Sequence, residues 1–470
     1  MHHKHTSRSS DGGSWIVLVL LCVAQFMVIL DVTVVNVALP SIGRSLHFRP
    51  ADLQWVVTAY VLFTGGLLLL GGRAADMVGR RIVFLTGLGV FTAASLASGL
   101  APSASALIVT RGAQGLGAAL LTPGALSTIT ALYTGAQRTT ALTVWGAIGG
   151  AGSAAGLVLG GVLTTLFGWR SVFFVNVPVG LVVALLALRF VAADSRVRVD
   201  RRQLDLPGAL SVVAGLVLLV YAVEGTGEHG WGSAHTLVPV ALAALLLTAF
   251  TVIERRVRSP LVPPTTWKVR SLSSGVVLMF GATGLLVGTF FLNSLYLQRV
   301  LDASALETGL AFLPITLVLG VGAHIATRLI PQIGSRALAV AGLALIAAGA
   351  ILLSLAPDHA SYASQLLPGF LTLGLGVGLV FPAASVTTMS DVEHESAGLA
   401  SGLMTTGHEI GAALGVATFS AIATSTGGSF AAGYGNGFLV AAIAAVALGV
   451  ITMLTVPAVR TTGEAGFAAH

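Results

Sequence analysis

Charged residues are scarce in this chain. Asp, Glu, Lys and Arg make up 9% of its 470 residues, whereas hydrophobic residues make up 55%. Soluble domains contain about 25% charged residues, so this composition excludes an ordinary soluble fold. Cys22 is the single cysteine, which excludes an internal disulfide and a thiolate metal cluster. No metal site is therefore predicted.

Apolar runs of about 20 residues, each long enough to cross a hydrocarbon layer of roughly 30 Å, recur along the whole chain. The fold class predicted from them is an all-α polytopic membrane protein with fourteen transmembrane helices. The spans are placed at 14–39, 53–72, 82–100, 104–130, 140–167, 171–192, 207–226, 234–254, 271–297, 306–328, 336–355, 362–387, 396–424 and 435–457.

Charged stretches follow the sixth and the eighth span, and they divide the spans into groups of six, two and six. Two six-helix halves with a binding site between them are a known transporter architecture. The predicted organisation is an N-terminal tail (1–13), a six-helix bundle (14–192), linkers with two inserted helices (193–270), a second six-helix bundle (271–457) and a C-terminal tail (458–470).

The basic residues predict how the chain is oriented, because Lys and Arg are retained on the cytoplasmic side of a membrane. With the N-terminus inside, nineteen of the 24 basic residues fall in cytoplasmic segments and four fall in outer loops. Both termini are thus predicted to be cytoplasmic. The excess of Arg over Lys, with abundant Ala, Gly and Val, indicates a high-GC bacterial genome, and hence the bacterial inner membrane. The basic residues are spread over many short loops, so a nucleic-acid surface is not expected.

Two opposite charges fall inside predicted spans. Asp31 lies about eight residues from the outer end of the first span, and Arg111 lies about seven from the outer end of the fourth. At 1.5 Å per residue both are roughly 10 to 12 Å deep, so they can pair if the two helices are neighbours. Gln114 lies one turn deeper on the same face. The pair is interpreted as a proton-coupling site, and the alternative is a fixed ion pair that only orients the helices.

Glycines and a short charged segment form two further motifs. Gly152, Gly156 and Gly160, continued by Gly161, form a ridge of small residues on the fifth span, which permits close helix contact. The segment between the second and third spans is interpreted as a cytoplasmic gate, and the alternative is a solvated basic loop. Asp76 is expected there to accept from arginines or to cap the third helix, and Gly79 to permit a tight turn. The gate residues are Gly72, Asp76, Gly79, Arg80 and Arg81.

Taken together, these segments resemble the major facilitator superfamily, and in particular its fourteen-helix drug:proton antiporter family. The resemblance implies that Arg111 takes part in proton transfer and that Asp76 and Arg80 stabilise the outward-facing state. Two positions depart from the family pattern: Leu157 replaces the usual proline of the helix-5 motif, and Met77 replaces a frequent arginine. The matching segments are Leu30 to Pro40, Gly72 to Arg81, Arg111 to Gly117, Trp169 to Gly180, and Ala400 to Gly402.

A second acid, Glu409, lies near the middle of the thirteenth span. We interpret it as a site for a proton or a cationic substrate, and the alternative is a structural acid whose hydrogen bonds are satisfied. Family members commonly carry Arg-Gln at 408–409, so no family role is transferred to it. The residues expected to line a substrate cavity are Asn36, Gln114, Asn293, Tyr296, Gln298, Thr405 and His408.

The function predicted from these features is proton-coupled export of an amphipathic drug or antibiotic by alternating access. The alternatives are a proton-coupled nutrient importer on the same fold, favoured by Leu157, and a membrane sensor that does not transport. The chain is not expected to be an enzyme, because no catalytic motif is recognisable. Its expected partners are protons, a small amphipathic substrate and the lipid bilayer, and it is expected to act as a monomer, without a cofactor, driven by the proton gradient.

Overall fold

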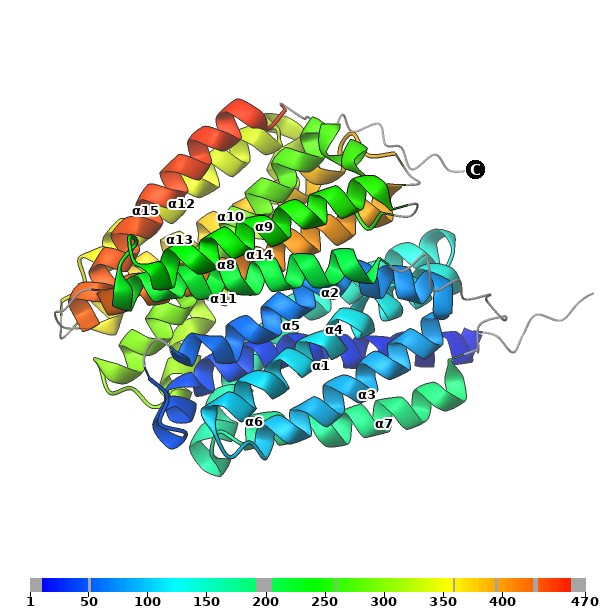
Figure 1. Ribbon diagram of the computed structural model, residues 1–470, viewed down its shortest axis with the longest axis horizontal. Coiled ribbons are helices and arrows are strands. Elements are labelled where there is room, and N and C mark those ends of the chain that lie inside the picture. The colour runs from blue at the N-terminus through cyan, green and yellow to red at the C-terminus, as the bar shows by residue number, and fades with distance from the viewer. Residues whose placement is uncertain are drawn as a thin grey trace, which may run out of the picture.

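The computed structural model describes residues 11–49, 52–191, 205–257, 260–357, 360–393, 396–425 and 430–457. Figure 1 shows these ranges as a bundle of long helices. The long helices are α1 (Asp11–Ser45), α2 (Trp55–Val78), α3 (Arg80–Gly99), α4 (Ala104–Leu132), α5 (Gly135–Phe167), α7 (Asn176–Phe190), α8 (Leu206–His229), α9 (Ala234–Arg256), α10 (Arg270–Arg299), α11 (Ala305–Ile333), α12 (Ser335–Ser354), α13 (Leu367–Met389), α14 (Ala397–Ser425) and α15 (Phe430–Thr455). Shorter turns are η1 (Asp52–Gln54), α6 (Ser171–Phe174), η3 (Pro264–Lys268) and the π-helix η4 (Tyr362–Leu366).

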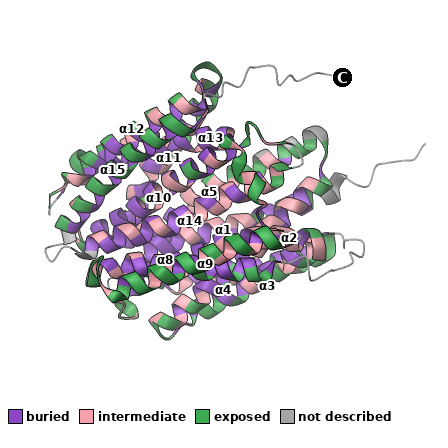
Figure 2. Ribbon diagram, turned by 45° about the horizontal axis from the view of Figure 1, so that its top comes forward, coloured by how far each residue is buried: buried purple, intermediate pink, exposed green. Residues whose placement is uncertain are grey.

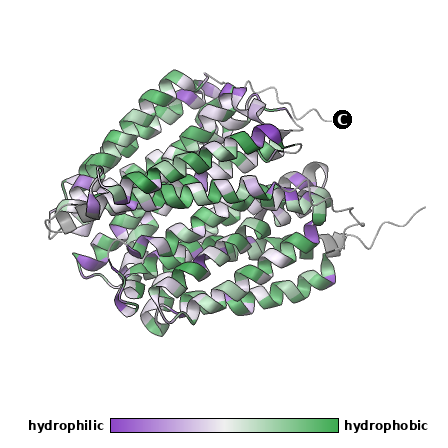
Figure 3. Ribbon diagram, in the orientation of Figure 1, coloured by the Kyte–Doolittle hydropathy of each residue, from purple (hydrophilic) through white to green (hydrophobic). Residues whose placement is uncertain are grey.

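Within the described ranges, thirteen helical stretches are long and apolar enough to cross a membrane, and α6 with α7 counts as one of them. The predicted thirteenth span corresponds to α14, a helix of 29 residues that contains His408 and Glu409. These two polar residues reduce its apolar character, but its length and its place inside the bundle match those of the other spans. Figure 3 shows hydrophobic residues along the helices and hydrophilic residues mainly towards the two ends of the molecule.

Two predicted boundaries were wrong. The first span was expected to end before Pro40, but α1 continues through this proline to Ser45. Asp31 therefore lies further from the end of its helix than predicted. Prolines are tolerated in membrane helices because neighbouring groups satisfy the freed backbone carbonyls. The gate motif was expected to be a loop, but α2 continues to Val78 and α3 begins at Arg80.

The helices pack in two groups, with one helix pair between them. In the first group, α1 packs against α5 and α7, and α4 packs against α2 and α3; in the second, α10 packs against α14, and α12 packs against α13 and α15. The groups meet along two seams, α2 with α14 and α5 with α11. Helix α8 covers the first seam, because it packs on both α2 and α14, and α9 packs on the outside of α8. Figure 2 shows buried residues concentrated where the helices meet and exposed residues on outer helices such as α9 and α15.

Polar caps mark where several helices begin. The Ser103 side chain accepts from the Ala106 amide at the start of α4, and Ser304 and Glu307 form a reciprocal capping box at the start of α11. Gly79 separates α2 from α3 with a φ of 113°, a conformation that side chains disfavour. This turn reverses the chain within one residue, and so α2 and α3 lie next to each other.

Candidate functional site

The two buried charges of the sequence meet in the structure. Arg111 Nη1 on α4 lies 2.5 Å from Asp31 Oδ2 on α1, and both side chains are completely buried. A guanidinium and a carboxylate at this distance form a charge-assisted hydrogen bond. The expected pairing is therefore present, at a depth where neither charge reaches solvent.

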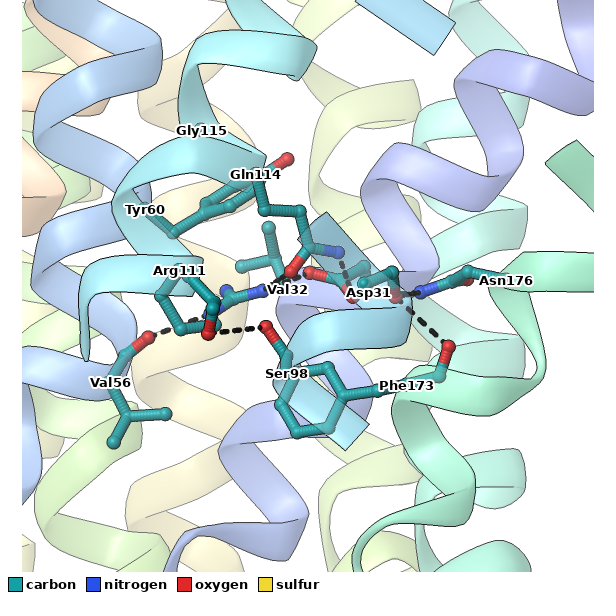
Figure 4. Close-up of polar contacts among 12 residues, drawn as sticks. Asp31, Val32, Val56, Tyr60, Ser98, Arg111, Gln114, Gly115, Phe173 and Asn176 are labelled. Atoms are coloured by element: carbon teal, nitrogen blue, oxygen red, sulfur yellow. Dashed lines mark hydrogen bonds and ion pairs between the residues drawn. The ribbon is translucent and has the colours of Figure 1, made fainter. Parts of the chain in front are cut away.

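Two polar side chains complete the surroundings of the carboxylate. Gln114 Nε2 donates to Asp31 Oδ1 at 2.8 Å, and its Oε1 accepts from Arg111 Nη1 at 2.7 Å. Asn176 Nδ2 on α7 donates to the same Asp31 oxygen at 2.9 Å and to Ser95 Oγ at 3.0 Å. Figure 4 shows these groups converging on Asp31 from different helices. Asp31 is thus held by one cation and two neutral donors.

The guanidinium of Arg111 is enclosed by α2 as well as by Asp31. Its Nε donates to the Val56 carbonyl at 2.9 Å, and its Cζ lies 4.4 Å from the centre of the Tyr60 ring. The remaining Nη2 is buried and makes no hydrogen bond among the described residues, which costs about 1–3 kcal/mol or more for a charged donor. The structure therefore depends on the Asp31 charge to keep Arg111 in place.

This arrangement can couple a proton to a change of contacts. A buried pair is tolerated while both charges are present, but neutralising one leaves the other uncompensated, which costs about 3–5 kcal/mol. Binding of a proton to Asp31 would remove the charge that Arg111 faces. The described residues contain no group of three or more potential metal ligands.

Glu409 lies on the other side of α2. A Cβ atom built on Gly65 of α2 would lie 2.5 Å from Glu409 Cβ, so α14 crosses α2 at this glycine. The Glu409 side chain is 21% exposed and that of the neighbouring His408 is 39% exposed, with His408 Nδ1 3.7 Å from Glu409 Oε1. Thr405, one turn earlier, is also partly exposed and donates to the Ser401 carbonyl. These α14 side chains are accessible, in contrast to Asp31.

Four of the residues expected to line a cavity are instead buried in packing contacts. Gln298 Nε2 on α10 donates to the Val37 carbonyl of α1, and Asn293 Oδ1 accepts from the Tyr434 hydroxyl at 2.7 Å. Tyr296 donates its hydroxyl to the Pro357 carbonyl, and Asn36 Nδ2 donates to the Val32 carbonyl within α1. All four are at most 6% exposed. Gln298, Asn293 and Tyr296 hold segments together because partners that are distant in sequence engage their polar atoms, whereas Asn36 bonds within α1.

The gate residues lie at the α2–α3 junction. Asp76 is exposed on the last turns of α2, where the charges of Arg80 and Arg73 act on it. The expectation that Asp76 caps the third helix was wrong, because Gly79 takes the N-cap position and no side chain bonds there. Arg81 Nη2 donates to the Leu188 carbonyl of α7 at 2.6 Å. Gly72 faces Pro123 of α4, whose Cβ would be 3.8 Å from an added Cβ.

The glycine ridge of α5 makes the close helix contacts that its spacing predicts. A Cβ on Gly156 would lie 2.7 Å from Thr33 Cβ, and one on Gly160 would lie 2.9 Å from Val34 Cα, both on α1; Gly152 faces Ile29 of the same helix. Gly161 instead meets Leu306 of α11, at 2.7 Å from its Cα. The ridge therefore joins α5 to α1 and also to the second helix group.

Sequence reasoning missed several residues of this site. Asn176 and Ser95 lie within apolar spans, and an amide in such a run is a signal that it has a partner. Tyr60 gave no signal, because a tyrosine in a membrane helix is common. Glu224 on α8 is 7% exposed and accepts a hydrogen bond from the Trp55 indole of α2. An acid within a predicted span was visible in the sequence, but its partner was not.

Comparison with known proteins then shows the family. The profile of the Major Facilitator Superfamily matches residues 21–416. The chain belongs to this superfamily. It is 42% identical over 464 residues to the cephamycin export protein CmcT of Amycolatopsis lactamdurans, covering 97% of this chain and 95% of that protein. It is also 42% identical over 431 residues to the puromycin resistance protein pur8 of Streptomyces alboniger, covering 91% of this chain and 85% of that protein.

Two solved transporter structures share the fold. A bacterial homologue of the human lysosomal transporter Spinster, in an inward-facing and occupied conformation, superimposes with a TM-score of 0.70 at 16% identity, covering 95% of this chain and 97% of that chain. The POT family transporter PepTSo gives a TM-score of 0.69 at 15% identity, covering 95% of this chain and 98% of that chain. The superfamily consists of transporters, so the chain is a multi-pass membrane transporter, and the prediction of a major facilitator fold is confirmed.

Proposed function

We propose that this transporter exports an amphipathic antibiotic across the bacterial inner membrane in exchange for protons. The observation that carries the proposal is the completely buried Asp31–Arg111 pair, in a chain 42% identical over nearly its full length to a cephamycin export protein. An acid inside a membrane span is typically a proton or substrate site. The relatives named for cephamycin, puromycin and lincomycin support an antibiotic as the class of substrate.

Transport proceeds by alternating access between the two helix groups. A proton that binds Asp31 removes the partner of Arg111, and the contacts of α1, α4 and α7 at the site are rearranged. Asp76 and Arg80 act at the cytoplasmic gate and favour the outward-facing state. One proton that moves down roughly 150 mV supplies about 3.5 kcal/mol, enough for a gradient of a few hundredfold in a neutral substrate.

The substrate contacts α14 in this proposal. Glu409, His408 and Thr405 are partly exposed polar side chains on one stretch of this helix, next to apolar residues such as Phe381, whose ring lies 6.0 Å from that of His408. A mostly apolar surface with few polar groups suits an amphipathic compound. Both termini face the cytoplasm, the protein acts as a monomer, and the proton gradient takes the place of a cofactor.

The test uses inverted membrane vesicles whose interior has been acidified by respiration. Puromycin, lincomycin and cephamycin are added in turn, and the luminal pH is followed with a quenched dye. Export in exchange for protons makes the lumen more alkaline in the wild type and not in Asp31→Asn. Asp52→Asn is the matched control, because Asp52 forms an exposed ion pair with Arg49 at 2.7 Å, away from the site.

The same vesicles separate the alternatives. Leu157, in place of the motif proline, favours a proton-coupled importer, which would move protons only when the compound is loaded inside the lumen. A sensor would bind a compound without any change of luminal pH. An unchanged response in Asp31→Asn would contradict the assignment of the proton site to this carboxylate.

A further inference from the structure

A smaller contact between the two helix groups lies apart from the α2–α14 and α5–α11 seams, where α1 meets α10. The Ser294 hydroxyl of α10 donates to the Asn36 carbonyl of α1 at 3.1 Å, and Gln298 Nε2 donates to the Val37 carbonyl at 3.0 Å. Both donors are buried, and they lie one turn apart on the same face of α10. Two side chains of the second group thus bind consecutive backbone carbonyls of the first.

The sequence of α1 explains why the Asn36 carbonyl needs a donor from another helix. In an α-helix each carbonyl accepts from the amide four residues later, and for Asn36 that residue is Pro40, which has no N–H. A buried carbonyl without a donor is costly, and a membrane offers it no water. The hydrogen bond that Pro40 cannot make is supplied by Ser294, which belongs to the other helix group.

The α1–α10 contact lies at the end of the bundle opposite the α2–α3 junction. Ser294 and Gln298 belong to the last turns of α10, which ends at Arg299. At the same end α5 packs tightly on α11, because a Cβ built on Gly309 would lie 2.3 Å from the Leu157 carbonyl oxygen. In the proposed orientation this is the outer end. The two helix groups are therefore in contact on the outer side in this structure.

We propose that Ser294 and Gln298 are positioning residues of the outer gate, which hold α1 against α10 while the transporter is closed to the outside. In that state the Asn36 and Val37 carbonyls are buried and depend on these donors. When the outer side opens, water enters between α1 and α10 and bonds to the carbonyls instead. Pro40 thus makes the closed state depend on the second helix group. The inference rests on the alternating access of the proposed function, but neither on its substrate nor on its protons.

Removal of one donor should destabilise the outer-closed state alone. Ser294→Ala leaves the Asn36 carbonyl without a donor in the closed state, whereas water serves it in the open state. We expect the ratio of outer-open to outer-closed molecules to rise about threefold to tenfold, as for the loss of one interhelical hydrogen bond in a membrane. Gln298→Leu should act in the same direction. Ser274→Ala is the matched control, because Ser274 is a buried serine of the same helix that donates within α10.

The two states can be counted by double electron–electron resonance on reconstituted full-length protein that carries Cys22→Ala. Four exposed positions receive spin labels in pairs, one pair across each end of the bundle. The pairs are Ser45→Cys with Leu310→Cys at the outer end and Ile82→Cys with Gln332→Cys at the inner end. In Ser294→Ala the outer distance should lengthen and the inner distance should shorten in the same fraction of molecules. A general loss of packing would broaden both distances without closing the inner end.

Pro40→Ala separates the proposed cause from a merely structural role of Ser294. This variant returns an N–H to the position that bonds the Asn36 carbonyl, so α1 can satisfy that carbonyl by itself. In the Pro40→Ala background we expect Ser294→Ala to shift the populations by less than about twofold, which is the non-additivity of two changes at one carbonyl. The effect of Gln298→Leu should persist there, because the regular partner of the Val37 carbonyl is the Ser41 amide.

Equal shifts by Ser294→Ala with and without Pro40 would overturn the dependence on the freed carbonyl. Unchanged distances in both Ser294→Ala and Gln298→Leu would overturn the gate, and so would broadening at both ends without closure of the inner end. Failure of the proposed exchange of drug for protons is detected separately, in the vesicle assay, because the distances are measured without substrate and without a pH gradient.

Discussion

Removing one charge of the Asp31–Arg111 pair should destabilise the protein far more than removing both charges. Asp31→Asn leaves Arg111 with two neutral acceptors, the Val56 carbonyl and Gln114 Oε1. Arg111→Gln leaves Asp31 with two neutral donors, Gln114 and Asn176. Because both side chains are completely buried, each single variant should lose about 3–5 kcal/mol of unfolding free energy.

The double variant Asp31→Asn with Arg111→Gln removes both charges and keeps groups that can still bond to each other. We expect it to unfold within about 2 kcal/mol of the wild type, because replacing both members of a buried pair is often close to neutral. The unfolding free energies of the four proteins, measured by titration with SDS in mixed micelles, complete a double-mutant cycle. All three variants should fail to export, since none retains both the carboxylate and its cation.

A double variant as unstable as the sum of the two single variants would refute this reasoning, because the charges would then not act as a pair. The size of this free-energy cost also matters for transport. The expected cost of isolating Arg111 is similar to the roughly 3.5 kcal/mol that one proton delivers. Protonation of Asp31 can therefore supply enough free energy to drive a rearrangement of the helices without unfolding them.

Three further predictions concern other parts of the structure. Gly160→Val should force α5 away from α1 and reduce export about tenfold or more in the vesicle assay, whereas Gly149→Val should not, because no atom lies within 4 Å of a Cβ at Gly149. Gly79→Ala should lower the unfolding free energy by about 1–3 kcal/mol in the SDS titration, since its φ of 113° strains any side chain; no loss would contradict this backbone. Glu224→Gln can still accept from the Trp55 indole and should unfold like the wild type, whereas Glu224→Leu should lose about 1–3 kcal/mol in the same titration.

The pairing of Asp31 with Arg111 could be predicted because a charge in hydrocarbon must be compensated, and Arg111 is a cation seven or more residues from either end of its predicted span. The glycine ridge was predictable for a similar reason, since small residues four apart leave few alternatives in a membrane helix. Helix ends were harder to predict. Pro40 did not end α1, and α2 continued into the Gly72–Arg81 segment, although a proline and a run of charges usually mark helix ends. Tertiary packing can satisfy the backbone groups that would otherwise be exposed there.

The burial of four predicted cavity residues could not be foreseen, for a different physical reason. The polarity of Asn293 and Gln298 was read correctly, but their partners lie 141 and 261 positions away, and no local pattern reveals which helix will be opposite. Asn176 shows the converse. It bonds to Asp31, 145 positions away, and its place in an apolar run indicates a partner but not which one.

The helix pair α8–α9 covers one seam between the two helix groups and not the other. Motion that separates α5 from α11 leaves the contacts of α8 intact, whereas motion at the α2–α14 seam must slide α8 against at least one of its neighbours, including the Trp55–Glu224 bond. The two helix groups can therefore separate more readily at the α5–α11 seam than at the α2–α14 seam, which α8 covers. A compound dissolved in the lipid would reach the bundle at the α5–α11 seam. Cross-links between α5 and α11 should therefore arrest transport more completely than cross-links between α2 and α14.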